Sequence, residues 1–397
     1  MLSKAVKLFA LPLVCLLINS AALAQVTTVY LESNRAERNS ILAFQNNGGE
    51  LSFLGEFPTG GEGVFDLSLK LGPFDSDQNV IANSEGTVLY AVNSGSDTIA
   101  IFKIGATGRL TPLAGSPFPS GGTNPVSVGL TRGTLAVVNK AMDPSRPRQN
   151  HPNYVAFNLA PDGAIDAGPL SNDSAPVGSS PSQAQISSGK RLVFDAQFLG
   201  GHLKSFLVDN NGVLTPEAFQ ALPASQFVGT PGPPAGLGLE VHPRKPILYV
   251  GFTSANRLGV YTYDATGHLA FVRSVRNSGQ AICWLKSNTV GTRLYTSNTN
   301  DNSISVYDIT NPLDPVEIQH LKLHGLGNSF QNIIDPRGTW LYVLTQRGSS
   351  SIPLGEGNTL HALRIDPVSG KLSEDHFVSL SLPKGTRPQG LAAVLTH

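Results

Sequence analysis

The chain has 397 residues, equal numbers of basic and acidic side chains (28 each), 14% charged residues and 40% hydrophobic residues. This hydrophobic content is sufficient for a large core, and the balanced charge provides no basic field that would attract nucleic acid or an anionic membrane. Gly (41) and Pro (28) together form about one residue in six, more than average but less than in low-complexity disorder. The composition therefore predicts a compact, turn-rich protein, with neither nucleic acid nor membrane as a partner.

Residues 1–24 have the pattern of a secretory signal peptide. Two lysines precede an apolar run at 8–18, and the segment ends in Ala-Ala-Leu-Ala, which is an Ala-x-Ala-like cleavage site. The apolar run is about half the length of roughly 20 residues that a membrane-spanning helix needs. We therefore expect cleavage after Ala24 and a secreted or periplasmic mature protein. An uncleaved N-terminal anchor is the alternative interpretation.

The residue types that carry metal or nucleophilic chemistry show no recognisable motif. The nine histidines include no His-Glu-x-x-His pattern, and the sequence has neither a Gly-x-Ser-x-Gly elbow nor a P-loop. Without the leader, Cys283 is the single cysteine, so no intramolecular disulfide can form. Its apolar neighbours indicate a buried structural thiol. We expect no metal and no cofactor.

The mature chain, residues 25–397, repeats one unit seven times and is expected to form a single domain. In each unit a tight turn precedes an apolar second strand, a third strand alternates in polarity, and a turn, usually with Gly, leads to a fourth strand. The anchor residues of the second strands are 46 to 60 residues apart, at positions 30, 90, 137, 194, 249, 295 and 342. Seven such units without a sustained helical period predict an all-β, seven-bladed β-propeller with four-stranded antiparallel blades.

The two ends of the chain are expected to close this ring by sharing a blade. The first unit begins with its second strand, because too few residues separate Gln25 from Tyr30 for another strand. Residues 387–396 provide a spare first strand after the seventh unit. Pairing of the two would remove the exposed edge of the ring. A two-sheet sandwich would require breaks in the repeat that the sequence does not contain.

Short phrases within the units also carry a family likeness. They include Leu89-Tyr90-Ala91-Val92-Asn93-Ser94, Asn124-Pro125-Val126-Ser127-Val128, Val241-His242-Pro243, Leu294-Tyr295-Thr296-Ser297-Asn298 and Asp335-Pro336-Arg337-Gly338. With them the chain resembles, over nearly its whole mature length, the seven-bladed propeller lactonase family, which includes 6-phosphogluconolactonases and carboxymuconate cyclases. The resemblance implies a secreted, divergent member with lactonase-like hydrolase activity. Most of these phrases build blades, so they specify fold better than activity.

The positions of the family's catalytic groups differ in this sequence. Family members have Arg-His in the first strand of the unit with His-Pro, a Glu after its second strand, and an Arg after Ser-Asn in the next unit. The corresponding residues here are Leu237-Gly238, Thr253 and Thr299. Without these polar groups the family mechanism cannot operate at those positions. Two functions stay open: hydrolysis or isomerisation of a small anionic lactone by other residues, or non-catalytic binding of a small ligand or partner protein.

A ligand site is expected at the channel mouth of the propeller. Connections between second and third strands lie on this face, and long insertions fall there at 140–153 in blade three and 347–357 in blade seven. The expected ligand is a carboxylate or lactone bound by a monomer, and a solvated loop without a ligand is the alternative. Asp195 is the predicted catalytic residue, activating water. The predicted ligand-binding residues are Lys140, Arg146, Arg148, His151, Gln197 and Arg35.

Overall fold

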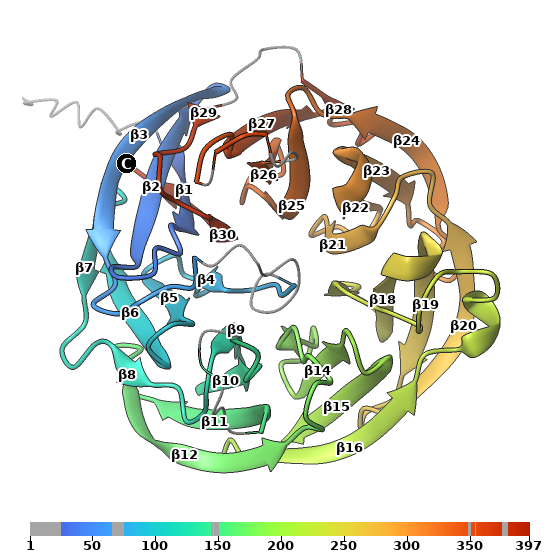
Figure 1. Ribbon diagram of the computed structural model, residues 1–397, viewed down its shortest axis with the longest axis horizontal. Helices are drawn as coiled ribbons and strands as arrows, with labels where there is room; N and C mark the ends of the chain where they lie inside the picture. The colour runs from blue at the N-terminus through green and yellow to red at the C-terminus, as the bar shows by residue number, and fades with distance from the viewer. Residues whose placement is uncertain are drawn as a thin grey trace, which may run out of the picture.

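The computed structural model describes residues 25–65, 75–143, 146, 151–347, 351–353, 355–374 and 380–397. Over these residues the chain forms seven antiparallel sheets arranged as a ring, so the predicted seven-bladed propeller is confirmed (Figure 1). The predicted signal peptide, residues 1–24, lies outside the described residues. No helix in the described part of the chain has the length and apolar character needed to cross a bilayer.

Each blade has four strand positions, which follow one another from the propeller centre to the rim. Blade one contains β30 (Gln389–Thr396), β1 (Val26–Glu32), β2 (Ser40–Asn47) and β3 (Glu50–Pro58). Blade two contains β4 (Val80–Ala82), β5 (Val88–Asn93) and β6 (Thr98–Ile104), with β7 (Leu110–Pro112) and β8 (Phe118–Pro119) sharing the outer position. Blade three contains β9 (Pro125–Leu130), β10 (Thr134–Asn139), β11 (Asn153–Leu159) and β12 (Ile165–Ser174).

The remaining blades follow the same order. Blade four contains β13 (Gln185–Ile186), β14 (Leu192–Gln197), β15 (His202–Val208) and β16 (Leu214–Ala221). Blade five contains β17 (Leu239–Val241), β18 (Ile247–Phe252), β19 (Arg257–Tyr263) and β20 (Leu269–Arg276). Blade six contains β21 (Ile282–Ser287), β22 (Arg293–Asn298), β23 (Ser303–Asp308) and β24 (Val316–Lys322). Blade seven contains β25 (Gly327–Ile334), β26 (Trp340–Arg347) and β27 (Thr359–Ile365), with β28 (Leu372–Ser373) and β29 (Leu380–Ser381) outermost. Three short 3₁₀ segments lie in connections: η1 (Ala224–Gln226), η2 (Thr253–Ala255) and η3 (Thr299–Asp301).

The ring closes as predicted, because the last strand of the chain is the inner strand of blade one. β30 pairs with β1 in antiparallel register from Val26↔Thr396 to Glu32↔Gln389. The hydroxyl groups of Thr28 and Thr396 lie 2.6 Å apart and form a buried hydrogen bond across the two ends. Closure therefore ties both ends of the described chain into one sheet.

The recurrent tyrosines of the second strands join neighbouring blades. In four blades the buried tyrosine hydroxyl donates to a backbone carbonyl in the outer turn of the next blade, and in blade seven it accepts from Asn46 instead. A buried hydroxyl needs such a partner, and the repeat provides it at a fixed place. The donor and acceptor pairs are Tyr30–Gly108 (2.7 Å), Tyr90–Gly163 (2.9 Å), Tyr249–Pro312 (3.0 Å) and Tyr295–Gly370 (2.9 Å).

Blade three lacks this tyrosine. Its equivalent residue lies one position before residue 137, which the repeat pattern predicted as the anchor of the second strand. Tyr90 stands three residues before Asn93, which forms the last pair of β5 with β6. Asn139 forms the last pair of β10 with β11, so the equivalent residue is Ala136 and the predicted anchor at 137 is wrong. Both candidates are apolar, which is why the pattern alone did not separate them.

The hydrophobic core lies between adjacent blades. One cluster joins Tyr30 and Ile41 of blade one to Leu89 and Phe102 of blade two, all of them buried, and similar clusters recur around the ring. Cys283 is buried in such a cluster, and burial raises the pKa of its thiol to about 12. The thiol is therefore protonated at neutral pH and acts as a small apolar side chain, as expected.

Candidate functional site at the propeller centre

Residues 75–79, here called the central segment, connect blade one to β4 and lie at the propeller centre. Their position follows from hydrogen bonds to four other blades, since a stretch this short reaches all four only from the middle of the ring. In Figure 1 the chain before β4 reaches this region. The bonds run from Trp284 Nε1 to Ser76 O (2.8 Å), from Gln331 Nε2 to Ser76 O (2.9 Å), from Asp77 N to Ser182 O (3.1 Å) and from Asn79 Nδ2 to Val126 O (2.8 Å).

Four polar side chains, here called the central cluster, meet beneath this segment: Asp77, Gln183, Glu240 and Lys286. The Gln183 amide nitrogen lies 3.5 Å from Asp77 Oδ2, and Lys286 Nζ lies 3.5 Å from Glu240 Oε2. The backbone N–H and hydroxyl of Ser287 donate to the other oxygen of Glu240, at 3.0 and 2.6 Å. The central segment and the inner strands of blades five and six thus bring two carboxylates and one ammonium group together.

The environment of the central cluster brings one carboxyl group into the neutral pH range. Burial raises the pKa of Asp77 to about 6, while Lys286 opposes the shift and Glu240 adds to it. The pKa of Lys286 is itself raised, mainly by Glu240, so this side chain stays cationic. The Lys286 side chain keeps 32% of its surface exposed. A carboxylate that titrates near neutrality beside a fixed cation has the properties of a general base next to an anion-stabilising group.

Asp195, the predicted catalytic residue, is completely buried in blade four. Its carboxylate accepts hydrogen bonds from the hydroxyl of Tyr154 (2.6 Å) and from the backbone N–H groups of Ser182 (2.8 Å) and Gln183 (2.9 Å). Burial raises the pKa of the Asp195 carboxyl. Gln197 donates to the same Tyr154 hydroxyl at 3.0 Å. These bonds fasten the stretch before β13 to β14, and a catalytic role for Asp195 or a binding role for Gln197 stays a prediction.

Lys140 is also buried, and it contacts the central segment. Its ammonium group donates to the backbone carbonyl of Asp75 at 2.6 Å. Burial lowers the pKa of Lys140 to about 8, whereas Asp75 and Asp195 oppose this shift. Lys140 thus contacts the central segment from blade three, and its role in ligand binding stays a prediction.

Arg146 of the blade-three insertion makes contacts within the protein on every side of its guanidinium group. Nη1 lies 2.8 Å from both oxygens of Asp97, Nε lies 2.9 Å from Asp143 Oδ2, and Nη2 donates to Ser94 O at 2.7 Å. Arg146 and Asp143 line a hollow of about 290 Å³ together with Val64. A ligand there would meet a guanidinium already shared between two carboxylates.

The other predicted binding residues lie apart from the central cluster. Arg35 forms an ion pair with Glu56 of β3, the outer strand of blade one. His151 is exposed at the end of the blade-three insertion. Arg148 lies outside the described residues. The predicted binding role of these three residues therefore stays a prediction.

At the positions of the family's catalytic groups the chain has close backbone packing. Leu237 is 1% exposed and packs in an apolar cluster with Phe198 and Trp284. A Cβ atom at Gly238 would lie 1.6 Å from the carbonyl oxygen of Cys283, so no side chain fits there without backbone movement. Buried apolar and backbone packing therefore occupies the positions at which family members have Arg and His.

Sequence reasoning missed the central segment and the central cluster. The available signal was the long connection between the first two units, residues 59–79, which exceeds the short loops typical of compact domains. Glu240, two residues before His242-Pro243, was a second signal. Among the described residues, no three His, Cys, Asp or Glu side chains are arranged to hold a metal ion.

No protein-family model matches the chain, and no curated protein matches it in sequence. Solved structures do match. A Bacteroides uniformis protein provisionally named a 6-phosphogluconolactonase has a TM-score of 0.67 at 14% identity, covering 93% of this chain and 99% of its own. The periplasmic gluconolactonase of Pseudomonas aeruginosa has a TM-score of 0.66 at 14% identity, covering 94% and 99%. A functionally unknown protein from Desulfotomaculum acetoxidans has a TM-score of 0.65 at 12% identity, covering 94% and 99%.

These similarities define the class of protein. The chain is a seven-bladed propeller with the fold of the lactonase-like structures, and the resemblance inferred from its blade phrases is confirmed at the level of fold. At such low identity the similarity shows the fold alone, and one propeller fold carries many activities. Any activity of this chain therefore depends on its own side chains, and the central cluster is the candidate site.

Proposed function

We propose that the protein hydrolyses small cyclic esters at the central cluster, as a secreted or periplasmic monomer. The observation that carries this proposal is Asp77, a partly exposed carboxyl group whose pKa of about 6 makes it a base near neutral pH. The fold shared with a periplasmic gluconolactonase supports the substrate class and the compartment. An anionic lactone would be attracted by Lys286.

The chemistry follows from the two charged groups. The Asp77 carboxylate takes a proton from water while the water oxygen forms a bond to the lactone carbonyl carbon. The Lys286 ammonium group stabilises the oxyanion that develops on the carbonyl oxygen. The ring C–O bond then breaks, and the leaving alkoxide takes the proton back from Asp77. The product is an open-chain hydroxy acid, and Gln183 holds the Asp77 carboxyl group in position.

The test is hydrolysis of a lactone panel, including aldonolactones, by the mature chain in a pH-indicator assay for acid release. Asp77→Asn should reduce turnover by at least 100-fold, because it removes the base. The control is Asp264→Asn, an exposed carboxylate in the outer turn of blade five, which should retain wild-type turnover. Absence of hydrolysis across the panel, or equal activity of both variants, would contradict the proposal.

Non-catalytic ligand binding is the second candidate, and the absence of the family's polar groups favours it. Leu237 and Gly238 replace polar groups, and Trp284 stacks on Phe330 nearby with ring centroids 4.7 Å apart. Saturable binding of a lactone that is recovered unchanged would support this function and exclude hydrolysis of that compound.

A further inference from the structure

A second concave region lies between blades three and four, on the face opposite the predicted ligand site. It is lined by turns between first and second strands, around Arg132 and Lys190, and by the outer turn of blade four at 209–212. The insertion at 140–153 follows the other end of β10, so the two regions are on opposite faces. The cleft holds about 520 Å³, within the range of small-molecule sites.

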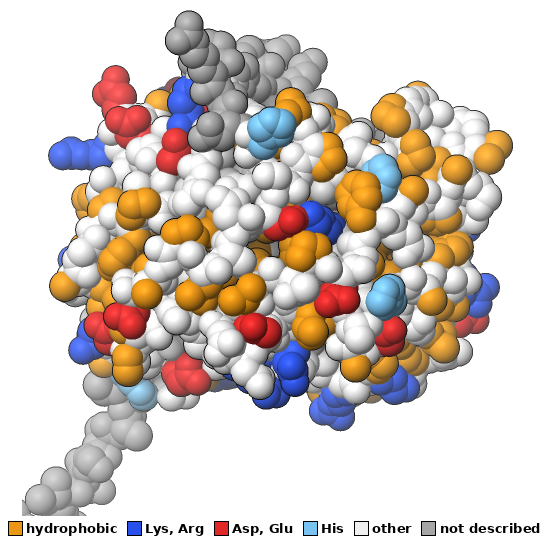
Figure 2. Space-filling model, turned by 90° about the horizontal axis from the view of Figure 1, so that it is seen from below, with side chains coloured by type: hydrophobic (Ala, Val, Ile, Leu, Met, Phe, Trp, Pro, Cys, Tyr) orange, Lys and Arg blue, Asp and Glu red, His pale blue; other side chains and the backbone are white. Residues whose placement is uncertain are grey.

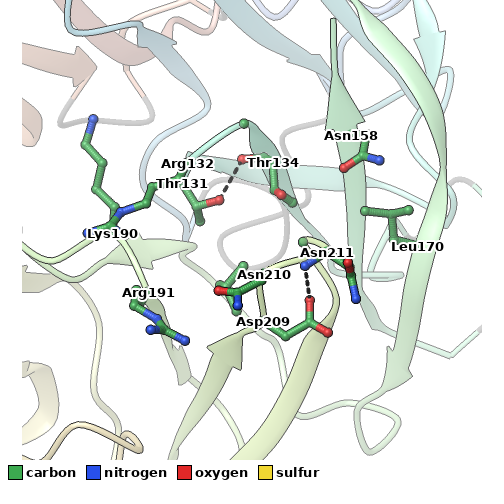
Figure 3. A pocket seen from close by; sticks show the side chains of 13 residues that line it. Thr131, Arg132, Thr134, Asn158, Leu170, Lys190, Arg191, Asp209, Asn210 and Asn211 are labelled. Carbon is green, nitrogen blue, oxygen red and sulfur yellow. Dashed lines mark hydrogen bonds between the residues drawn. The ribbon is translucent and has the colours of Figure 1, made fainter.

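The cleft lies at one of the two joints that lack the recurrent tyrosine, since blade three has Ala136 and blade four has Phe194 at this position. Ala136 stands where five other blades have a tyrosine that bonds to the outer turn of the next blade. The outer turn of blade four is therefore not tied to blade three by a tyrosine hydroxyl. Thr134 and Asn158 of blade three face this turn instead and leave polar groups along the cleft (Figure 3).

Positive charge dominates the lining. Arg132, Lys190 and Arg191 are exposed, and among the described residues no carboxylate lies within ion-pair distance of any of the three. The backbone carbonyl of Gly189 accepts a bond from Arg132 at 3.2 Å. In the edge-on view of Figure 2, several Lys and Arg side chains lie along the lower face of the disc.

The nearby acidic groups do not neutralise this charge. Among the residues that the structure describes, Asp209 is the one carboxylate that lines the cleft, and its Oδ1 accepts hydrogen bonds from the backbone N–H groups of Asn211 and Val213, each at 2.8 Å. Glu85 lies near Lys190 in an adjoining hollow of about 670 Å³. Three cations therefore face one carboxylate that already caps its own turn.

We propose that this cleft binds a small polyvalent oxyanion, in which phosphate or carboxylate groups carry the charge. Guanidinium groups match the geometry of both groups by paired hydrogen bonds, and Lys190 adds a point charge. The hydroxyl of Thr134 and the amides of Asn158, Asn210 and Asn211 provide neutral donors in the same cleft (Figure 3). This site is independent of the proposed hydrolysis at the central cluster.

The test is isothermal titration calorimetry of the mature chain at about 20 mM salt, with inorganic phosphate and with citrate as probes. The double variant Lys190→Ala, Arg191→Ala should weaken binding at least tenfold. The matched control is Arg244→Ala, Lys245→Ala, which removes two exposed cations from the equivalent turn of blade five. Binding should also weaken at 0.5 M salt, since the cations are exposed and screened.

Each outcome decides the proposal. Binding of phosphate alone, or of both probes, that is lost in the 190/191 variant and retained in the 244/245 control supports it and identifies the preferred group. Absence of saturable binding by either probe overturns it, as does equal loss in both double variants. Asp77→Asn should leave this binding unchanged, which separates the result from that of the hydrolysis assay.

Discussion

The joints between blades and the propeller centre are built on different principles. At four of the joints the same interaction recurs, in which a tyrosine hydroxyl of one blade donates to a turn carbonyl of the next, as in Tyr30 and Gly108. At the centre nothing repeats, because residues 75–79 make a different bond to each blade that they touch. The repeat therefore determines the ring, whereas a single non-repeated connection determines the candidate site.

Deletion of residues 387–397 should have the largest effect, because it removes β30 and exposes an unpaired edge in blade one. We expect the truncated chain to be insoluble or to lack a cooperative thermal transition. The measurement is circular dichroism during heating, with the mature chain as the reference. A soluble truncated protein with an unchanged melting temperature would show that ring closure does not depend on this strand.

Trp284→Ala should lower the free energy of unfolding by about 3–5 kcal/mol. The substitution removes a large buried side chain at the propeller centre, its stacking on Phe330 and its hydrogen bond to Ser76. Chemical denaturation of the variant and of wild type measures this loss. The control is Trp340→Ala at the joint of blades seven and one, where the side chain is only partly buried and the loss should be smaller. Equal losses would mean that the centre is no more tightly packed than a joint.

Tyr30→Phe should lower the free energy of unfolding by about 1 kcal/mol, because it leaves the Gly108 carbonyl without its hydroxyl partner. Tyr261→Phe is the matched control, since the Tyr261 hydroxyl is buried without a hydrogen-bond partner. The control should be neutral or slightly stabilising. If the two substitutions have the same effect on the free energy of unfolding, the tyrosine joints contribute packing alone.

Asp77→Asn should have the smallest effect on stability, with a sign that depends on pH. The folded-state pKa of Asp77, about 6, exceeds its ordinary value, so stability is lost as the pH rises through 6. The variant should be more stable than wild type at pH 8 by about 1 kcal/mol, after allowance for solvent screening, and equal to it below about pH 4.

Asp264→Asn is the control for the direction of this pH-dependent change in stability. The pKa of Asp264 is lowered to about 2, chiefly by a hydrogen bond from Thr266, so its stabilising contribution is present at neutral pH and lost in acid. This variant should be slightly less stable than wild type at pH 8. A stability difference for Asp77→Asn that does not change between pH 4 and pH 8 would contradict the shifted pKa.

The sequence predicted the ring because its determinants repeat. The tyrosines, the turn glycines and the alternating third strands each appear several times. The repeat could therefore be recognised even though the anchor residue of the second strand in blade three was predicted at 137 instead of 136. The closing strand, β30, was predicted from the missing strand of the first unit. The central cluster was missed because no repeat marks its members, which come from different parts of the chain and are each used once: Asp77, Gln183, Glu240 and Lys286. Arg146 appeared free in the sequence, and its carboxylate partner Asp97 lies in another blade.

The most direct test of Asp77 as the catalytic base is the pH dependence of lactone hydrolysis by wild type and by Lys286→Met. In wild type, kcat/KM should rise with pH through an apparent pKa of about 6, as Asp77 ionises. Loss of the ammonium group that opposes the burial effect should move this midpoint to higher pH and lower the maximum rate. A midpoint that is the same in both proteins, or a rate that does not fall below pH 6, would contradict the assignment of Asp77 as the base.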